Sequence, residues 1–308
     1  MRKFLIDTDT GIDDSIAIMM AACQPDVEIV AITSCFGTAT IENTTKNILD
    51  LCDCIDLKTR IAKGAEKPIV APKTYPGEFH GKNGMGDAVF PPSSLQLDPT
   101  HAWDVIYQEA VKANGELIIV TLGPVTNMGI ALLKYEDLPK YVKKVVVMGG
   151  GTKQGNVTPY CEANIWNDAH AAEILFKSGM DIYMDGLNAT EQVRMTTKET
   201  NRMFAKRTIL NPMLDKMLET YKHSQNVSGE FGNLINDAAA MTVAIDPTTA
   251  EWIKYNVTVE TAFGNMYGRT VVDFRPFSNG EKNINVVMKI DKQAYMRLLD
   301  EMITFYQR

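Results

Sequence analysis

The chain begins with an apolar segment that leads directly into a dense acidic run. Phe4-Leu5-Ile6 is followed by Asp7-Thr-Asp9-Thr-Gly11-Ile-Asp13-Asp14, and the apolar stretch Ile16-Ala-Ile-Met-Met20 comes after it. This order predicts a buried strand, a tight turn at Gly11 and a helix. In an open α/β sheet, ligands bind in the loops that follow the carboxyl ends of the strands. We therefore expect these carboxylates at a ligand-binding edge.

The close spacing of the carboxylates in the acidic run predicts a bound cation. Four carboxylates within eight residues repel one another strongly unless a cation joins them. A hard divalent cation takes oxygen ligands from Asp side chains and from backbone carbonyls. The alternative is a solvated acidic turn that caps a helix N-terminus, where Asp is favourable. Two of the four residues suffice for capping, so a metal site explains the run better.

Composition limits the classes of function. The chain has 308 residues, 45% hydrophobic and 22% charged, which is ordinary for one soluble domain with insertions, and we expect a single domain over 1–308. A net charge of −7 argues against nucleic acid as a partner. The N-terminal apolar stretch is too short for a signal peptide, and no apolar run is long enough for a membrane span, so we expect a cytoplasmic protein. The cysteines lack Cys-x-x-Cys spacing and predict neither a disulfide framework nor a zinc site: Cys23, Cys35, Cys52, Cys54 and Cys161.

Short apolar runs alternate with helical patterns along most of the chain. Such alternation is typical of βαβ units around a mainly parallel sheet flanked by helices. The predicted strands are Lys3–Asp7, Val27–Ser34, Arg60–Lys63, Leu117–Leu122, Lys144–Met148 and Asp181–Met184. The predicted helices are Asp14–Cys23, Ile41–Ile55, Ala102–Ala113, Val125–Leu133 and Ala169–Ser178. Gly-containing turns after several strands predict a loop-rich active site at the strand C-terminal ends.

Two other regions complete this outline. The Pro- and Gly-rich segment 67–99, with His80 near its centre, is interpreted as a long functional loop. Helical patterns are predicted from Thr196 to Ser224 and over Asp237–Ile245. The tail predicts strands and a final helix at Ile253–Val259, Arg269–Asp273, Asn283–Ile290 and Lys292–Phe305.

Acidic and amide residues recur at element ends far from the N-terminus. Glu162-Ala-Asn164 follows a triple-Gly turn, Asn156 lies just before it, and Asn236-Asp237 opens a predicted helix. We expect one metal ion to be held by Asp9, Asp14, Asp237 and the backbone carbonyl of Leu122, which would leave room for water and a sugar diol. Asp13 and Asn164 offer complementary hydrogen bonds. Taken singly, residues such as Asn156 and Asn164 are more often ordinary turn residues.

Together these motifs resemble the inosine-uridine-preferring nucleoside hydrolase family. The motifs that carry the resemblance follow the family's order over most of the chain: the Asp7–Asp14 run, Leu122-Gly-Pro-Val-Thr-Asn127, Val147-Met-Gly-Gly-Gly151, Gly155-Asn156, Glu162-Ala-Asn164 and Thr270-Val-Val-Asp273-Phe. The resemblance implies a Rossmann-like α/β fold, a tightly held calcium ion and hydrolysis of the N-glycosidic bond of ribonucleosides. It also implies a homodimer or homotetramer.

The resemblance further implies a role for individual residues. Calcium would be held by Asp9, Asp14, the Leu122 carbonyl and Asp237. Asp9 would also be the general base toward the metal-bound water. The ribose 2′- and 3′-hydroxyls would be bound by Asp13, Asn164 and Asp237. The 5′-hydroxyl would be held by Asn156, Glu162 and the Met148 main chain.

The base-binding half departs from the family pattern. Family members carry a histidine, thought to protonate the departing base, where this chain has Asn236, and an amide is no general acid at neutral pH. Thr38 replaces a usual asparagine in the substrate pocket, and Ala163 replaces a residue that is often aromatic. Replacement acids are His80, which ranks first, His223 and Glu230; stacking candidates are Phe36, Phe79 and Phe231.

Three alternatives remain open on sequence grounds. Phe4-Leu-Ile-Asp7-Thr-Asp9-Thr10 also fits the nucleophile loop of a haloacid-dehalogenase-type phosphatase, although Gly86-Asp87 lacks the second acid that this class needs. Asn236 motivates a ribose- or nucleoside-binding homologue without catalysis. Ala163 leaves room for a nucleosidase that acts on a modified base.

Overall fold

The computed structural model describes residues 1–308 except 73–79, 206–214, 217–218, 220–232, 278–279 and 308. Its centre is an eight-stranded sheet with the order β3-β2-β1-β4-β5-β6-β10-β7. The strands are β1 (Arg2–Thr8), β2 (Val27–Ser34), β3 (Arg60–Lys63), β4 (Leu117–Thr121), β5 (Val142–Met148), β6 (Ile182–Asp185), β7 (Ala250–Tyr255) and β10 (Ile284–Ile290). Neighbouring strands are parallel except for β10 and β7, which are antiparallel. The predicted mainly parallel sheet is confirmed.

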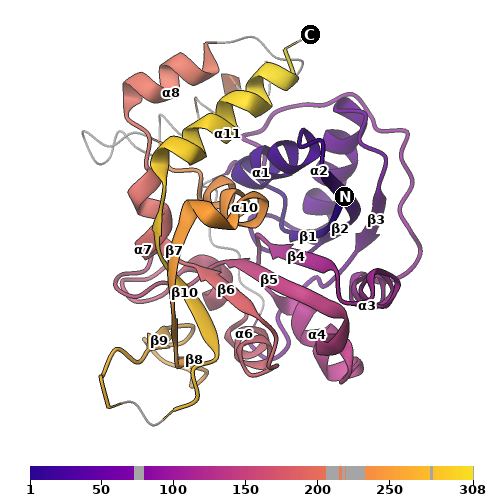
Figure 1. The fold of residues 1–308 in the computed structure, drawn as a ribbon. Coiled ribbons are helices and arrows are strands. Elements are labelled where there is room, and N and C mark those ends of the chain that lie inside the picture. Colours follow the sequence, from indigo (N-terminus) through magenta and orange to yellow (C-terminus); the bar gives the residue numbers. More distant parts are fainter. Residues whose placement is uncertain (73–79, 206–214, 217–218, 220–232, 278–279, 308) are drawn as a thin grey trace.

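Helices cover both faces of this sheet (Figure 1). One face packs against α1 (Ile12–Ala22), α2 (Ile41–Cys54), α10 (Asn236–Ile245) and α11 (Lys292–Phe305). The other packs against α3 (Ala102–Ala113), α4 (Thr126–Lys134) and α6 (Ala169–Phe176). The shorter helical elements are η1 (Leu138–Tyr141), α5 (Ala163–Asn167), α7 (Leu187–Thr190), η2 (Glu191–Val193), α8 (Thr197–Phe204) and η3 (Pro247–Thr249).

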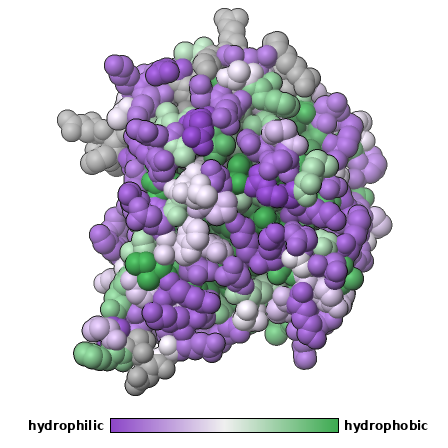
Figure 2. Space-filling model, viewed as in Figure 1, coloured by the Kyte–Doolittle hydropathy of each residue, from purple (hydrophilic) through white to green (hydrophobic). Residues whose placement is uncertain are grey.

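Burial explains why the apolar runs become strands. Phe4 and Ile6 of β1 point into one apolar layer and Leu5 into the other, and all three are fully buried. Strands that are buried on both faces read as continuous hydrophobic runs, as β1 and β4 do. The face seen in Figure 2 is mostly hydrophilic, with apolar residues scattered over it. None of the helices among the described residues is long and apolar enough to cross a membrane.

Strand order determines where a ligand can enter. The chain runs from β1 outward through β2 to β3 and then returns to β4 on the other side of β1. The crevice at the carboxyl ends of β1 and β4 is therefore a topological switch point, the usual ligand site of such sheets. The acidic run begins at Asp7 near the end of β1 and continues beyond it, and Leu122 follows β4.

One predicted strand is wrong. Ile253–Val259 was expected to be continuous, but β7 ends at Tyr255, and β8 (Val257–Val259) pairs with β9 (Thr270–Val272) in a separate two-stranded sheet. Asn256 interrupts the strand, because its side chain donates to the Glu281 carbonyl and its own carbonyl accepts from Asp273 N–H. The helical pattern beyond α8 falls largely outside the described residues.

Candidate active site

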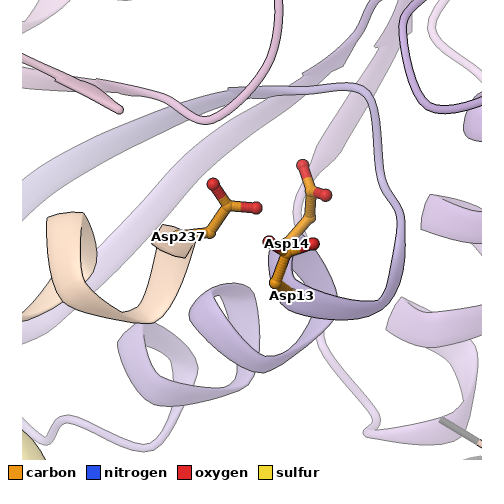
Figure 3. Close-up of side chains that lie close together, drawn as sticks. All are labelled: Asp13, Asp14 and Asp237. Carbon is orange, nitrogen blue, oxygen red and sulfur yellow. The ribbon is translucent and has the colours of Figure 1, made fainter. Parts of the chain in front are cut away.

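Three carboxylates from two helices converge at the switch point. Asp13 and Asp14 lie in the first turn of α1, and Asp237 lies in the first turn of α10 across from them (Figure 3). One oxygen from each lies within 4.8 Å of the others, and all three residues are buried. We call Asp13, Asp14 and Asp237 the carboxylate cluster.

The protein environment penalises negative charge in this cluster. Burial raises the pKa of Asp13 to about 6. Burial, followed by repulsion from Asp13, also raises the pKa of Asp14, and the pKa of Asp237 is raised well above its usual value for the same reasons. A divalent cation would offset both effects, since it replaces lost hydration and screens the repulsion. The donor set of carboxylate oxygens fits a hard cation such as calcium.

His80 lies beside the cluster and provides little positive charge. Its Nδ1 is 3.8 Å from Asp13 Oδ1, and burial lowers the pKa of His80 to about 4, so the ring is neutral near pH 7. Asn47 ties the loop of His80 to the acidic run, because its Nδ2 donates to the carbonyls of Thr10 (2.9 Å) and Asn83 (2.8 Å). The predicted functional loop therefore reaches the carboxylate cluster.

Asp14 and Asp9 are held by different partners. Asp14 accepts from Gly11 N–H at 2.9 Å and from the Thr8 hydroxyl. Asp9 Oδ2 accepts from both the backbone N–H and the hydroxyl of Thr38, the latter at 2.7 Å. Burial, followed by repulsion from Asp14, raises the pKa of Asp9 well above its usual value. Asp9 thus shares the electrostatic environment of the cluster while its Oδ2 is turned toward Thr38.

Glycines make room for the Asp9 carboxylate on two sides. A Cβ on Gly37 would lie 2.1 Å from Asp9 Oδ2, and one on Gly123 would lie 2.5 Å from Asp9 Oδ1. Both distances are far inside van der Waals contact, so no other residue fits at either position without moving Asp9. These glycines belong to the turns after β2 and β4.

Asn164 joins the ends of β4 and β5. Its Nδ2 donates to the carbonyls of Leu122 (2.8 Å) and Met148 (3.1 Å). Glu162 caps α5 by accepting from the N–H groups of Asn164 and Ile165, and it also accepts from Gly150 N–H. These hydrogen bonds hold Asn164 and Glu162 against the ends of β4 and β5.

The remaining predicted residues lie at the edges of the site. Asn156 is exposed, and its Oδ1 accepts from Ala163 N–H at 2.9 Å. Asn236 is half-buried at the start of α10. Phe36 is fully buried and cannot stack on a ligand. Phe79, His223, Glu230 and Phe231 lie outside the described residues.

Asp7 supports the acidic run from below. Its Oδ1 accepts from the Thr33 hydroxyl (2.6 Å) on β2 and from Asn127 Nδ2 (2.7 Å) on α4. Asn127 also binds Ala65 N–H and the Ser34 carbonyl, which links three loops of the rim. Sequence reasoning missed Thr8, Asn47 and Asn127 as supporting residues. Thr8 belongs to the acidic run and Asn127 to the Leu122–Asn127 motif, whereas Asn47 lies far from both in the sequence and carried no such signal.

A further buried carboxylate lies on the same rim. Asp185 ends β6 opposite Met148, is fully buried, and has no hydrogen-bond partner for either carboxylate oxygen among the described residues. Burial alone raises the pKa of Asp185 well above its usual value. The sequence did not identify it.

Asp185→Asn is expected to become more stable relative to the wild type as the pH rises. The raised folded-state pKa means that the folded protein favours the protonated form, so the wild type loses stability as pH rises above the unfolded-state pKa of about 3.9. An asparagine does not titrate and lacks this loss. Thermal unfolding midpoints of both proteins between pH 5 and pH 8 check the prediction. A difference in midpoint that does not change with pH would contradict it.

Comparisons with known proteins agree with this geometry. The model of the family described as inosine-uridine preferring nucleoside hydrolase matches residues 4–297. A pyrimidine-specific ribonucleoside hydrolase, RihB, from Shigella sonnei is 30% identical over 306 residues, covering 99% of this chain and 98% of the relative. A probable uridine nucleosidase 2 from Oryza sativa is 36% identical over 280 residues, covering 88% of this chain and 82% of the relative. The solved structure of a purine-preferring ribonucleoside hydrolase from Gardnerella vaginalis has a TM-score of 0.90 at 31% identity, covering 99% of both chains.

Proposed function

The chain belongs to the inosine-uridine preferring nucleoside hydrolase family, and on this premise we propose that it hydrolyses the N-glycosidic bond of ribonucleosides to free base and ribose. The observation that carries the proposal is the buried carboxylate cluster at the switch point between β1 and β4. A phosphatase of the haloacid dehalogenase type is set aside, because it leaves this cluster and the family match unexplained.

The proposed metal is calcium. Asp14, Asp237 and the Leu122 carbonyl are offered as ligands together with Asp9, and Asp13 lies close enough to take part. When bound, such a cation lowers the pKa of a coordinated water and orients vicinal hydroxyls. The raised pKa values of Asp9, Asp14 and Asp237 support a site that favours positive charge.

Asp9 is proposed as the general base. Thr38 holds one carboxylate oxygen by two donors, which leaves Oδ1 to accept the proton of an attacking water. A positioned base of this kind contributes roughly 10²–10⁴-fold to rate. Gly37 and Gly123 leave the space that the Asp9 carboxylate occupies.

The ribose is proposed to bind through its hydroxyls. Asp13, Asp237 and Asn164 are proposed to bind the 2′- and 3′-hydroxyls. The side-chain nitrogen of Asn164 already donates to the backbone carbonyls at the ends of β4 and β5. Glu162, which accepts from the backbone N–H groups of Gly150, Asn164 and Ile165, is proposed to hold the 5′-hydroxyl. Asn156 and the Met148 main chain are proposed beside it. Substrate contact by Thr38 remains a prediction, since both its donors here serve Asp9.

The buried carboxylates also suit the reaction electrostatically. Cleavage of a glycosidic bond passes through an oxocarbenium-like sugar that carries positive charge. Asp9, Asp13 and Asp237 surround the proposed sugar position, so they stabilise the transition state more than the neutral substrate.

A substrate panel tests the proposal. Uridine, cytidine, inosine, guanosine, adenosine and a base-modified nucleoside are incubated with the purified protein, and reducing sugar is measured. We expect ribose release from at least one of them. Binding without any ribose release would instead support the non-catalytic homologue, a second reading that the amide at Asn236 motivates.

The assembly and location of the protein also remain proposals. We propose a single domain over 1–308, supported by β7 and β10 from the C-terminal part joining the sheet that β1 begins. We further propose a homodimer or homotetramer in the cytoplasm, and light scattering coupled to size exclusion measures the mass directly.

A further inference from the structure

Asn236 occupies a special place beside the carboxylate cluster. It is the first residue of α10 and directly precedes Asp237. Ile235 and Asp237 are buried, whereas Asn236 is half-buried. The Asn236 side chain is therefore partly accessible to solvent, and it lies next to the position proposed for the sugar.

Thr190 holds the Asn236 side chain in one orientation. Thr190 ends α7, is fully buried, and its hydroxyl donates to Asn236 Oδ1 at 2.8 Å. Because the amide oxygen is engaged on this side, the NH2 group at the other end of the planar amide is left to donate. Among the described residues, no hydrogen bond from Asn236 Nδ2 competes with this use.

Backbone hydrogen bonds anchor the short helix that carries Thr190. Thr190 N–H donates to the Gly186 carbonyl, and Leu187 N–H donates to the Gly150 carbonyl, which anchors α7 to the turn after β5. Gly186 and Gly150 pack so closely that a Cβ on Gly186 would lie 2.8 Å from the Gly150 oxygen. The hydroxyl of Thr190 is therefore well placed to set the orientation of Asn236.

We propose that Thr190 positions Asn236 as a neutral hydrogen-bond donor to the departing base, and that this selects ribonucleosides whose base leaves as a stabilised anion. This inference rests on the proposed hydrolase function and deepens it. Uridine is the type substrate, because uracil spreads the negative charge over N1 and O2. Adenosine is the contrasting case, because its base leaves most readily after protonation, which an amide does not supply.

The step balances without a protein acid. The C1′–N1 bond breaks and its electron pair stays with uracil, while the water oxygen bonds to C1′ and gives its proton to Asp9. As negative charge develops on O2, the uracil anion accepts a hydrogen bond from the side-chain N–H of Asn236. It takes a proton from solvent after release. A donor directed at developing charge acts mainly in the transition state, so its removal lowers kcat more than it raises KM.

The test compares leaving groups across a small set of variants. Asn236→Ala, Thr190→Val and Thr190→Ser are assayed with uridine, adenosine and p-nitrophenyl riboside, whose phenolate leaves without help. Asn236→Ala is expected to lower kcat for uridine on the order of 10²-fold. Thr190→Val is expected to lower it roughly 2- to 10-fold, since it removes one neutral hydrogen bond. Thr190→Ser is expected to restore the wild-type value, and p-nitrophenyl riboside hydrolysis is expected to stay within about 3-fold throughout, because a phenolate gains little from the donor.

Thr242→Val is the matched control. Thr242 is also a fully buried threonine of the same helix, and its hydroxyl donates at 2.8 Å to the Ala238 carbonyl rather than to Asn236 or to a cluster carboxylate. We expect it to leave all three rates unchanged.

Several outcomes would overturn the inference. They are an equal loss on all three substrates, no loss in Asn236→Ala, and a wild-type preference for adenosine over uridine. If the wild type releases ribose yet shows one of these, the orientation of Asn236 is not the selecting feature and the hydrolase proposal stands. If it hydrolyses no nucleoside at all, the hydrolase proposal itself fails.

Discussion

Replacement of Asp9 by alanine is expected to lower ribonucleoside hydrolysis on the order of 10³-fold or more while leaving the fold intact. The variant removes the proposed base, and with it a carboxylate that shares the environment of the cluster. Burial and repulsion already disfavour the negative charge of Asp9, so its removal stabilises the folded state. This gain offsets the loss of the two hydrogen bonds from Thr38. Steady-state ribose release and thermal unfolding measure the two parts of this prediction.

Asp9→Asn removes the same charge as Asp9→Ala while keeping the size of the side chain, and Asp185→Asn is a suitable control for it. Both variants neutralise a fully or nearly fully buried carboxylate at the same rim of the sheet, but Asp185 has no proposed part in the reaction. We expect activity to be lost only in the Asp9 variant. Substantial turnover by Asp9→Ala would contradict the proposed role of Asp9 as the general base.

Removal of the metal is expected to have the second large effect. A chelator should abolish turnover and lower the thermal midpoint, and added calcium should restore both. Calcium that binds only the folded state stabilises it by about 2.7 kcal/mol at a free concentration 100 times the dissociation constant. The physical reason is the buried cluster, whose carboxylates repel one another until a cation joins them.

Asp237→Asn separates a specific site from general salt effects. This variant keeps the size of the side chain but removes one charge of the cluster, so we expect weaker calcium binding by calorimetry and a smaller shift in midpoint. Full activity in protein shown by elemental analysis to be free of metal would contradict the proposed calcium site.

Much of the fold follows from local patterns along the chain. Runs such as Phe4-Leu5-Ile6 are apolar on both faces, which requires a strand covered by helices on each side. The β7–β8 boundary at Asn256 could not be predicted in this way. It depends on hydrogen bonds to Glu281 and Asp273, residues that are near only in the folded chain.

The candidate site likewise has features that follow from local sequence and features that depend on the folded chain. The acidic run by itself determined that carboxylates gather at a strand end, because these residues are neighbours in the chain. That Asp13 joins Asp14 and Asp237, while Asp9 turns one oxygen to Thr38, follows from the folded arrangement and not from neighbouring residues. The same holds for the hydrogen bond between Asn236 and Thr190, which lies 46 residues away. The reason is physical: local sequence sets periodicity and burial, whereas the partner of each polar side chain depends on which loops the packed sheet brings together.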